Sequence, residues 1–267
     1  MEKIDSSESK CLLRMDKNGV ATLTLNRPDK FNPLSLEMLE AMQEELDKIS
    51  QDSNVRVVVL EAKGKAFCAG HDLKEMSATP EKKFYKDLFE RCTKMIMTIN
   101  RIPQPVIAKI EGIATAAGCQ LVAACDLAVA SDKVRFATSG IRYGLFCSTP
   151  AVAISRKMHR KKALEILLTG EFISAEDAEK QGLINYAVPA DQLDGIVKKL
   201  TDAIITKSAV AVSTGKKMFY EQIEMNMQDA YDFAGEVISE NMMDYDAQEG
   251  FKAFLEKREP VWNHGLT

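Results

Sequence analysis

Two glycine-containing turns are the segments of this sequence whose residue types best suit chemistry. The first reads GKAFCAGHDLKEM at residues 64–76, and the second reads EGIATAAGCQ at residues 111–120. Small residues let a ligand approach the backbone closely, and a helix that begins in such a turn leaves NH groups without partners. Two helix starts that face each other could donate two NH bonds to one negatively charged oxygen. Small residues at helix starts also serve packing, so a purely structural role stays open.

The runs around these turns alternate between strand and helix patterns for roughly the first 190 residues. Apolar and β-branched residues predict strands at residues 20–25, 55–60, 106–110, 127–130 and 184–188. Ser35 is expected to cap a helix that begins at Leu36, and apolar residues at three- and four-residue steps predict another helix over 84–99. Each turn therefore follows a predicted strand.

The pattern becomes helical from about residue 191. Helices are predicted at residues 193–205, 209–220, 229–244 and 248–257, and this tail contains many of the methionines. A methionine-rich helical face is typical of a core or of a subunit interface. We therefore predict an α/β core over residues 1–190 and a C-terminal helical region over residues 191–267.

Composition narrows the class of partner. A net charge of -4 argues mildly against nucleic acid, although a local basic pocket for a phosphate-bearing ligand remains compatible. The six cysteines show no CxxC pair, which indicates reduced thiols, and the three histidines lie too far apart in sequence to support a metal site. No apolar run approaches the ~18 residues of a membrane span, and the polar N-terminus is unlike a signal peptide. We expect a cytoplasmic protein, or a mitochondrial-matrix protein if the chain is a processed form.

Further short motifs accompany the two turns in a fixed order. They are Asn26-Arg27-Pro28 with Asn32, Cys125-Asp126-Leu127, Leu168-Thr169-Gly170 before Ser174-Ala175, Gly182-Leu183 before Val188-Pro189, and Glu249-Gly250 before Lys257-Arg258. Together with the turns, they resemble the crotonase (enoyl-CoA hydratase/isomerase) superfamily over nearly the whole chain. The resemblance implies an α/β fold, a crotonase-like spiral of β-β-α units with a C-terminal helical trimerisation region. It also implies a homotrimer or homohexamer.

The same resemblance implies an enzyme acting on an acyl-CoA thioester, with no permanently bound cofactor. The backbone NH groups of His71 and Ala117 would stabilise an enolate oxygen, and the His71 side chain would be incidental. Alanines at positions 116 and 117 would then be tolerable only if the backbone avoids positive φ there. The implied substrate- and CoA-binding residues are Lys30, Ala69, Asp72, Leu73, Lys74, Gly140, Cys147, Ser148, Phe254 and Lys257, with Asp72 tending to hold the turn and the last two reaching a neighbouring subunit.

The sequence departs from the family at both catalytic glutamates. Gln120 stands at the first of these positions and Gly140, counted without a gap, at the second. An amide cannot exchange a proton near neutral pH, although it can orient water or substrate. We therefore expect hydration to be weak or replaced by another acyl-CoA reaction. Glu111 or the Cys147-Ser148 pair could substitute, and a non-catalytic acyl-CoA-binding or scaffold protein remains the alternative.

Overall fold

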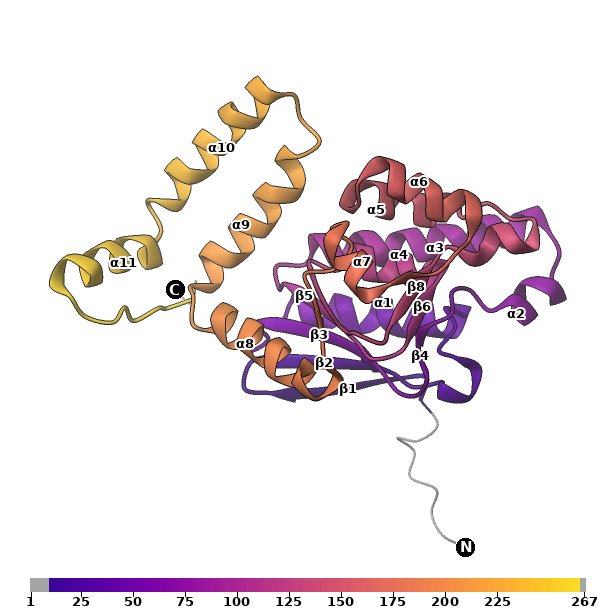
Figure 1. Cartoon of the computed structure of the whole chain (residues 1–267). Helices are drawn as coiled ribbons and strands as arrows, with labels where there is room; N and C mark the ends of the chain where they lie inside the picture. Colours follow the sequence, from indigo (N-terminus) through magenta and orange to yellow (C-terminus); the bar gives the residue numbers. More distant parts are fainter. Residues whose placement is uncertain (1–9, 265–267) are drawn as a thin grey trace, which may run out of the picture.

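A six-stranded sheet forms one side of the core in the computed structural model, which describes residues 10–264 (Figure 1). In spatial order its strands are β1 (Leu12–Lys17), β2 (Val20–Leu25), β3 (Val57–Ala62), β5 (Val106–Ile110), β7 (Leu127–Ser131) and β10 (Tyr186–Val188). Only the β1–β2 pair is antiparallel, and the other neighbours are parallel. The strands predicted at 20–25 and 106–110 are confirmed with the same bounds.

A second, four-stranded sheet contains the short strands β4 (Ala66–Cys68), β6 (Ile113–Thr115), β8 (Arg135–Ala137) and β9 (Ile173–Ser174), in this order. Each of β3, β5 and β7 in the large sheet is followed along the chain by β4, β6 or β8 in the small one, and then by helical segments. The chain thus repeats a β-β-α unit, and the predicted spiral is confirmed. Because β4, β6 and β8 are parallel neighbours, the segments that follow them start at one edge of the small sheet.

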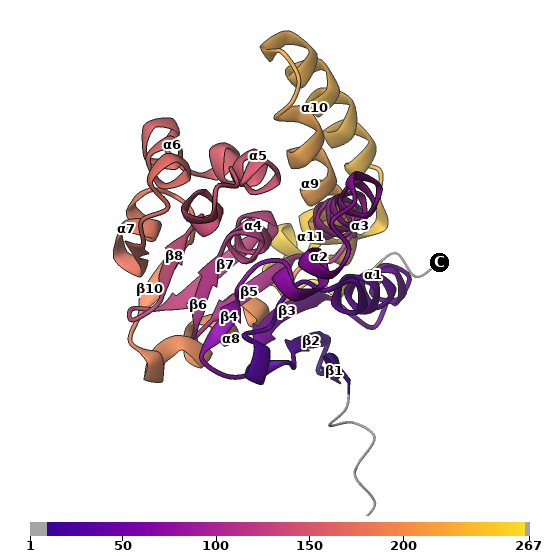
Figure 2. The same ribbon diagram turned by 90° about the vertical axis from the view of Figure 1, so that its right-hand side faces the viewer.

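The helices that follow the strands cover the core. They are α1 (Leu36–Ser50), α2 (Leu73–Ala78), α3 (Lys82–Arg101), α4 (Ala117–Ala124), α5 (Ser148–Lys157), α6 (Arg160–Thr169) and α7 (Ala175–Lys180). The predicted cap is confirmed, since the Ser35 side chain accepts a hydrogen bond from the Met38 NH. All eight residues of α4 are buried, and Figure 2 shows this helix between α3 and the α5–α6 pair.

Strand β3 illustrates how the two faces of the large sheet are filled. Val58 and Leu60 belong to the main apolar core, whereas Val59 packs with Leu193 and Val197 of α8 (Leu193–Ile205) on the other face. Successive side chains of a strand point to opposite faces, so a strand covered on both sides is apolar throughout. This accounts for the unbroken VVVL run in β3.

The C-terminal helices extend away from the sheets. After α8 come α9 (Ala209–Gln222), α10 (Met227–Asn241) and α11 (Tyr245–Glu256), and Figure 1 shows α9 and α10 as a hairpin projecting from the core. The predicted starts of α8 and α9 are confirmed. Exposed apolar side chains cluster on α10, α11 and the turn between them: Met227, Tyr231, Ile238, Met243, Phe251, Phe254 and Leu255. None of the described helices is long and apolar enough to cross a membrane.

A buried ion pair fastens α9 to the core. The Lys216 ammonium lies 2.7 Å from Asp126 Oδ2 and also donates to the carbonyls of Ile99 (2.7 Å) and Gln104 (2.9 Å). The Tyr220 hydroxyl, one helical turn further, donates to Asp126 Oδ1 at 2.8 Å. These bonds satisfy charges that would otherwise be costly to bury, and they fix the face of α9 that looks toward α3 and α5.

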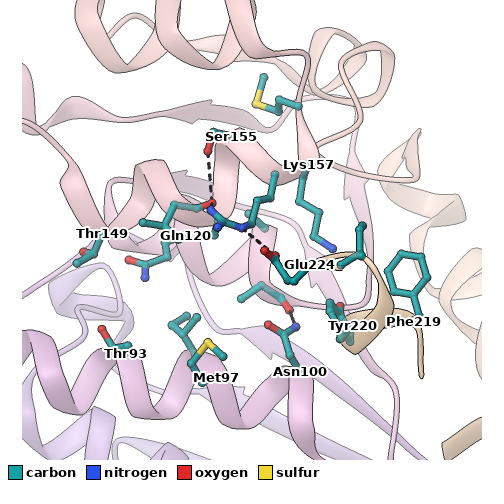
Figure 3. A pocket seen from close by; sticks show the side chains of 18 of the residues that line it. Thr93, Met97, Asn100, Gln120, Thr149, Ser155, Lys157, Phe219, Tyr220 and Glu224 are labelled. Atoms are coloured by element: carbon teal, nitrogen blue, oxygen red, sulfur yellow. Dashed lines mark hydrogen bonds and ion pairs between the residues drawn. The ribbon is translucent and has the colours of Figure 1, made fainter. Parts of the chain in front are cut away.

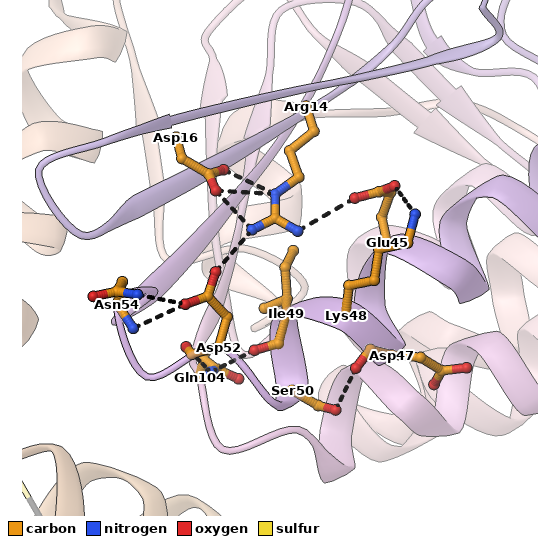
Figure 4. Close-up of polar contacts among 10 residues, drawn as sticks. All are labelled: Arg14, Asp16, Glu45, Asp47, Lys48, Ile49, Ser50, Asp52, Asn54 and Gln104. Atoms are coloured by element: carbon orange, nitrogen blue, oxygen red, sulfur yellow. Dashed lines mark hydrogen bonds and ion pairs between the residues drawn. The ribbon is translucent and has the colours of Figure 1, made fainter. Parts of the chain in front are cut away.

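Arg14 likewise joins two elements through ion pairs, at the β1 edge of the large sheet. Its guanidinium is 2.6 Å from Asp16 of its own strand, 3.3 Å from Glu45 of α1 and 3.3 Å from Asp52 in the following loop (Figure 4). One cation thus joins the edge strand β1 to α1. Since no strand within residues 10–264 pairs with the outer side of β1, this side-chain network helps to define its position.

Candidate functional site

The two glycine-containing turns lie against each other. The Thr115 hydroxyl of the second turn donates a hydrogen bond to the Ala69 carbonyl of the first, at 3.0 Å. A methyl group built on Gly70 would lie 3.3 Å from the nitrogen of Ala117. The contact follows from the parallel pairing of β4 with β6, which ends both strands at the same edge. The structure therefore brings together the segments that sequence reasoning paired.

Backbone NH groups in both turns are free to bind a ligand. Within residues 10–264, no hydrogen-bond partner is found for the NH of His71 or the NH of Ala117. Ala117 is the first residue of α4, and the preceding Ala116 has no side chain that could cap the helix. The first NH groups of a helix carry partial positive charge, so an anionic oxygen is favoured there.

Ala116 has an unusual backbone, and this corrects the expectation that positive φ is avoided at the paired alanines. Its φ is 50° and its ψ is -120°, while Ala117 is already helical. The conformation is held because the Ala116 NH donates to Ala137 O at 2.9 Å, and its carbonyl accepts from Cys119 and Gln120. A non-glycine residue in such a region costs about 1–3 kcal/mol, which the surrounding bonds must offset.

The His71 imidazole is a packed group. Its Nδ1 is 3.1 Å from the Leu34 carbonyl, and its ring meets Phe89 of α3 edge-on with centroids 5.3 Å apart. Burial lowers the pKa of His71 below its ordinary value, so the neutral ring donates from Nδ1 to Leu34. Its Nε2 is buried and has no partner among the described residues.

The predicted CoA-binding residues near the first turn occupy neighbouring loops. Asp72 accepts hydrogen bonds from the NH groups of Lys74 (2.9 Å) and Glu75 (3.3 Å), so it caps α2 and holds the turn. Lys30 ends the short 3-10 helix η1 (Pro28–Lys30), and the loop after it accepts the Ala69 NH at 3.0 Å. Both lysines are exposed.

The remaining residues of that predicted set are spread over the molecule. Leu73 is an exposed residue at the start of α2, whereas Phe254 and Lys257 lie in and just after α11, which Figure 1 shows far from α2. Within this chain the structure does not bring Phe254 or Lys257 to the turns.

Gln120 borders a cavity of about 1560 Å³ that extends from α4 between α3, α5 and the end of α9 (Figure 3). The residue is only 4% exposed, and its side-chain Oε1 has no partner among residues 10–264. Buried amide oxygens are nearly always hydrogen-bonded, so this atom is suited to accept a bond from water or from a ligand hydroxyl. It lies in the first turn of the helix whose N-terminal NH is free.

Gly140 leaves no space for an acidic side chain. It lies in the 3-10 helix η2 (Ser139–Tyr143), where a Cβ would stand 2.7 Å from Leu145 O and 2.8 Å from Cys147 Sγ. The Cys147 thiol is buried, and burial raises its pKa, so it is protonated at neutral pH. Ser148 donates to Phe146 O at 3.4 Å.

Glu111 is exposed and lies 3.6 Å from Lys109, so it has the surroundings of a surface charge. Among residues 10–264, no group of three or more His, Cys, Asp or Glu side chains could hold a metal ion.

Sequence reasoning missed Lys157 and Tyr220, which line the cavity from α5 and α9. Nothing in their local sequence signals this, because the two helices meet only in the folded chain.

Comparison with known proteins places this geometry in a family. The enoyl-CoA hydratase/isomerase family model matches residues 15–265. The enoyl-CoA hydratase domain-containing protein 3, mitochondrial, of Xenopus laevis is 45% identical, covering 93% of this chain and 84% of that protein.

Solved structures agree. The crystal structure of an enoyl-CoA hydratase from Mycobacterium smegmatis is 55% identical, with a TM-score of 0.93 over 94% of this chain and 98% of that one. Human enoyl Coenzyme A hydratase domain-containing protein 3 is 42% identical, with a TM-score of 0.92 over 94% of this chain and 100% of its own. With its matching sequence, β-β-α spiral and solved relatives, this chain belongs to the enoyl-CoA hydratase/isomerase family.

Proposed function

We propose that this protein is an acyl-CoA thioester enzyme in which the NH groups of His71 and Ala117 bind the thioester oxygen. The observation that carries the proposal is the pair of partnerless NH groups on adjoining turns. Negative charge grows on that oxygen when an enolate forms, so donors already in place stabilise the transition state more than the ground state. One such donor contributes about 3–4 kcal/mol.

Gln120 is assigned a positioning part in the reaction. It cannot donate or remove a proton as a glutamate would, but its free Oε1 can accept a bond from a water or a hydroxyl beside the thioester. Gly140 offers no second carboxylate and no space for one. Ordinary hydration is therefore expected to be slow, and decarboxylation, in which loss of CO2 forms the enolate without a base, is the more suitable chemistry for this site.

Turnover of a panel of enoyl-, malonyl- and 3-hydroxyacyl-CoA esters tests the proposal. His71→Pro removes one NH donor, and His71→Ala is its matched control because it retains the NH while deleting the imidazole. We expect His71→Pro to lower kcat/KM by about 100-fold or more and His71→Ala to change it little. Equal losses in the two folded variants would contradict a backbone donor.

The second candidate is a non-catalytic acyl-CoA-binding or scaffold protein, favoured by the replacement of both glutamates by Gln120 and Gly140. It predicts that CoA esters bind in calorimetry while no ester in the panel is consumed above the His71→Pro background. Gain of hydratase activity by Gln120→Glu from an inactive parent would support it further.

We further propose that Lys30 and Lys74 bind CoA phosphates and that the chain forms a homotrimer or homohexamer through the C-terminal helices. The exposed apolar residues of α10 and α11 support the assembly, and Phe254 and Lys257 would then reach a neighbouring subunit's CoA. Light scattering at micromolar concentration should give a trimer or hexamer, and Leu255→Asp should shift it toward monomer. A wild-type monomer would refute the assembly.

We infer the mitochondrial matrix as the compartment, because the names of animal relatives include the word mitochondrial. The six cysteines support a reducing compartment, since all are free and buried. Fractionation of cells expressing the full-length protein tests this, and recovery in the cytosol would support the cytoplasmic alternative.

A further inference from the structure

The cavity beside Gln120 has an unpaired cation on its wall. Lys157, the last residue of α5, extends its side chain along this wall, with its Nζ 5.2 Å from the centroid of the Tyr220 ring (Figure 3). Within residues 10–264, no carboxylate forms an ion pair with it and no acceptor is hydrogen-bonded to it. The Asp126 carboxylate, which lies nearby, is already bonded to Lys216 and to the Tyr220 hydroxyl.

The cavity wall as a whole also carries more positive than negative side chains. Arg101, Arg156, Arg160 and Lys217 also border it, against Glu221 and Glu224. Arg156 pairs with Glu224 at 3.3 Å, which uses one of these carboxylates. A surplus of positive charge remains over Lys157 and its neighbours, so an anion is favoured there.

The wall between Gln120 and this cationic part is largely apolar. Ala123 and Ala124 continue the face of α4 that carries Gln120, and Ile96 and Met97 of α3 lie opposite. Methylene groups can pack against such a surface, whereas a charged group cannot. A chain that starts at the N-terminus of α4 would pass Gln120 and this apolar stretch before it meets the ammonium of Lys157.

We propose that Lys157 binds a carboxylate at the far end of the acyl chain, so that the substrates are CoA thioesters of dicarboxylic acids. The inference rests on the proposed function, which places the thioester at the start of α4. A carboxylate would supply the acceptor that the half-buried ammonium lacks, and charge-assisted bonds of this kind are strong. Burial lowers the pKa of the Lys157 amine, and the charge of the nearby Asp126 carboxylate offsets only part of this effect.

Binding of matched ester pairs tests the inference. Each pair joins a saturated ω-carboxyacyl-CoA to the neutral acyl-CoA with the same number of carbons, over lengths from succinyl to suberyl, and calorimetry gives Kd. The wild-type protein should bind at least one carboxylate ester about tenfold or more tightly than its neutral partner. Lys157→Met should abolish this preference by weakening the carboxylate ester alone, whereas Lys157→Arg should retain it.

Lys161→Met is the matched control, because Lys161 is exposed on α6 and does not border the cavity. It should preserve the preference, and Lys157→Gln serves if the methionine variant does not fold. Equal affinity within every wild-type pair would overturn the inference while leaving the proposed function intact. Equal weakening of both esters and of free CoA by Lys157→Met would mean that the lysine binds a CoA phosphate. That result would also overturn the inference. Absence of binding by every CoA ester would refute the proposed function and the inference together.

Discussion

At the scale of single residues, Gln120 combines a cost to stability with a use in the site. Its Oε1 is buried without a partner in the described part of the chain, which is unfavourable for folding alone. The same residue borders the cavity that begins at the free end of α4. A residue kept only for packing would not need this oxygen.

Gln120→Leu should therefore separate stability from activity. Leucine has a similar size and no unsatisfied oxygen, so the free energy of unfolding should stay within about 1 kcal/mol of the wild type or rise. Turnover of the best CoA ester should fall by about tenfold, because the bond to water or hydroxyl is lost. Urea unfolding and steady-state kinetics measure the two effects, and unchanged kcat/KM would remove Gln120 from the site.

Gly140 is constrained by its neighbours and not by its own backbone. Gly140→Ala should lower the free energy of unfolding by about 1–3 kcal/mol, because the new methyl group meets Leu145 O and Cys147 Sγ. Gly215→Ala is the control: this glycine is inside α9 with no atom near its Cβ, so the change should stabilise by about 0.5–1 kcal/mol. Equal stability of both variants in urea would show that the loop moves freely. A glutamate at position 140 faces the same obstacle.

At the scale of elements, α9 is both a wall of the cavity and a helix that depends on one buried charge pair. Lys216→Met should lower the free energy of unfolding by about 3 kcal/mol, since it leaves the Asp126 carboxylate buried without its cation. Lys217→Met, on the exposed side of the same helix, should have little effect. Similar denaturation midpoints for the two variants would mean that the pair contributes nothing.

Long elements could be predicted from the sequence, and short ones could not. The helix patterns of α1 and α3 gave their positions because three or more turns repeat the apolar spacing, whereas the helix predicted at 229–244 ends at Asn241 and the one predicted at 248–257 begins at Tyr245. The predicted strand at residues 55–60 instead begins at Val57, because the Val55 NH bonds to Asp52 O in a turn. The small sheet was not located from residue patterns, since strands of two or three residues have no measurable period.

The candidate site likewise has residues that could be predicted from the sequence and residues that could not. Local motifs and the family resemblance identified the turns that carry His71 and Ala117, because each turn is encoded by adjacent residues. Lys157 and Tyr220 belong to helices that meet only when α9 folds back on the core, so no spacing rule finds them. The positive φ of Ala116 was also unforeseen, because it is fixed by a bond to Ala137 on another strand.

At the scale of the whole molecule, the chain after α11 returns to the start of α9. The Trp262 indole donates to Thr206 O at 2.9 Å, and the Asn263 NH donates to Asp246 at 2.8 Å. His264 lies with Nδ1 3.0 Å from an Arg56 nitrogen and accepts the Ala209 NH at 3.3 Å. Residues 258–264 thus connect α11 with the core.

This connection should loosen in acid. Burial and the Arg56 charge lower the pKa of His264 below its ordinary value of 6.5, so its neutral form stabilises the bound segment above that pH. That stability is lost as pH falls below about 6.5, because the released histidine takes up a proton more readily. Trp262 is the only tryptophan, so its fluorescence emission reports on this segment. The emission of the wild type should change between pH 7 and 5, and that of His264→Gln should not. His159→Gln is the control variant and should behave as the wild type does.

Glu249 should hold the same segment to a lower pH. Hydrogen bonds from Arg258 and the Val261 NH lower the pKa of its carboxyl group from 4.5 to about 2. Its contribution is present above pH 4.5 and is lost as pH falls toward 2. A second emission change in that range, absent in Glu249→Gln, is the expected result, and a single transition for all variants would contradict separate contributions.

The contact between Gly70 and Ala116 limits how this protein can evolve. A methyl group on Gly70 would stand 3.0 Å from the one that Ala116 already carries, and both residues have positive φ. The effect of a mutation at either position therefore depends on the residue at the other, and the order of the two changes matters. Ala116→Gly is open as a first step because it relieves the backbone, whereas any side chain at position 70 adds crowding to strain. Gly70 and Ala116, which shape the ligand-facing edge, are therefore also an epistatic pair. A change at one position can be neutral in one lineage and harmful in another, depending on the residue at the other position.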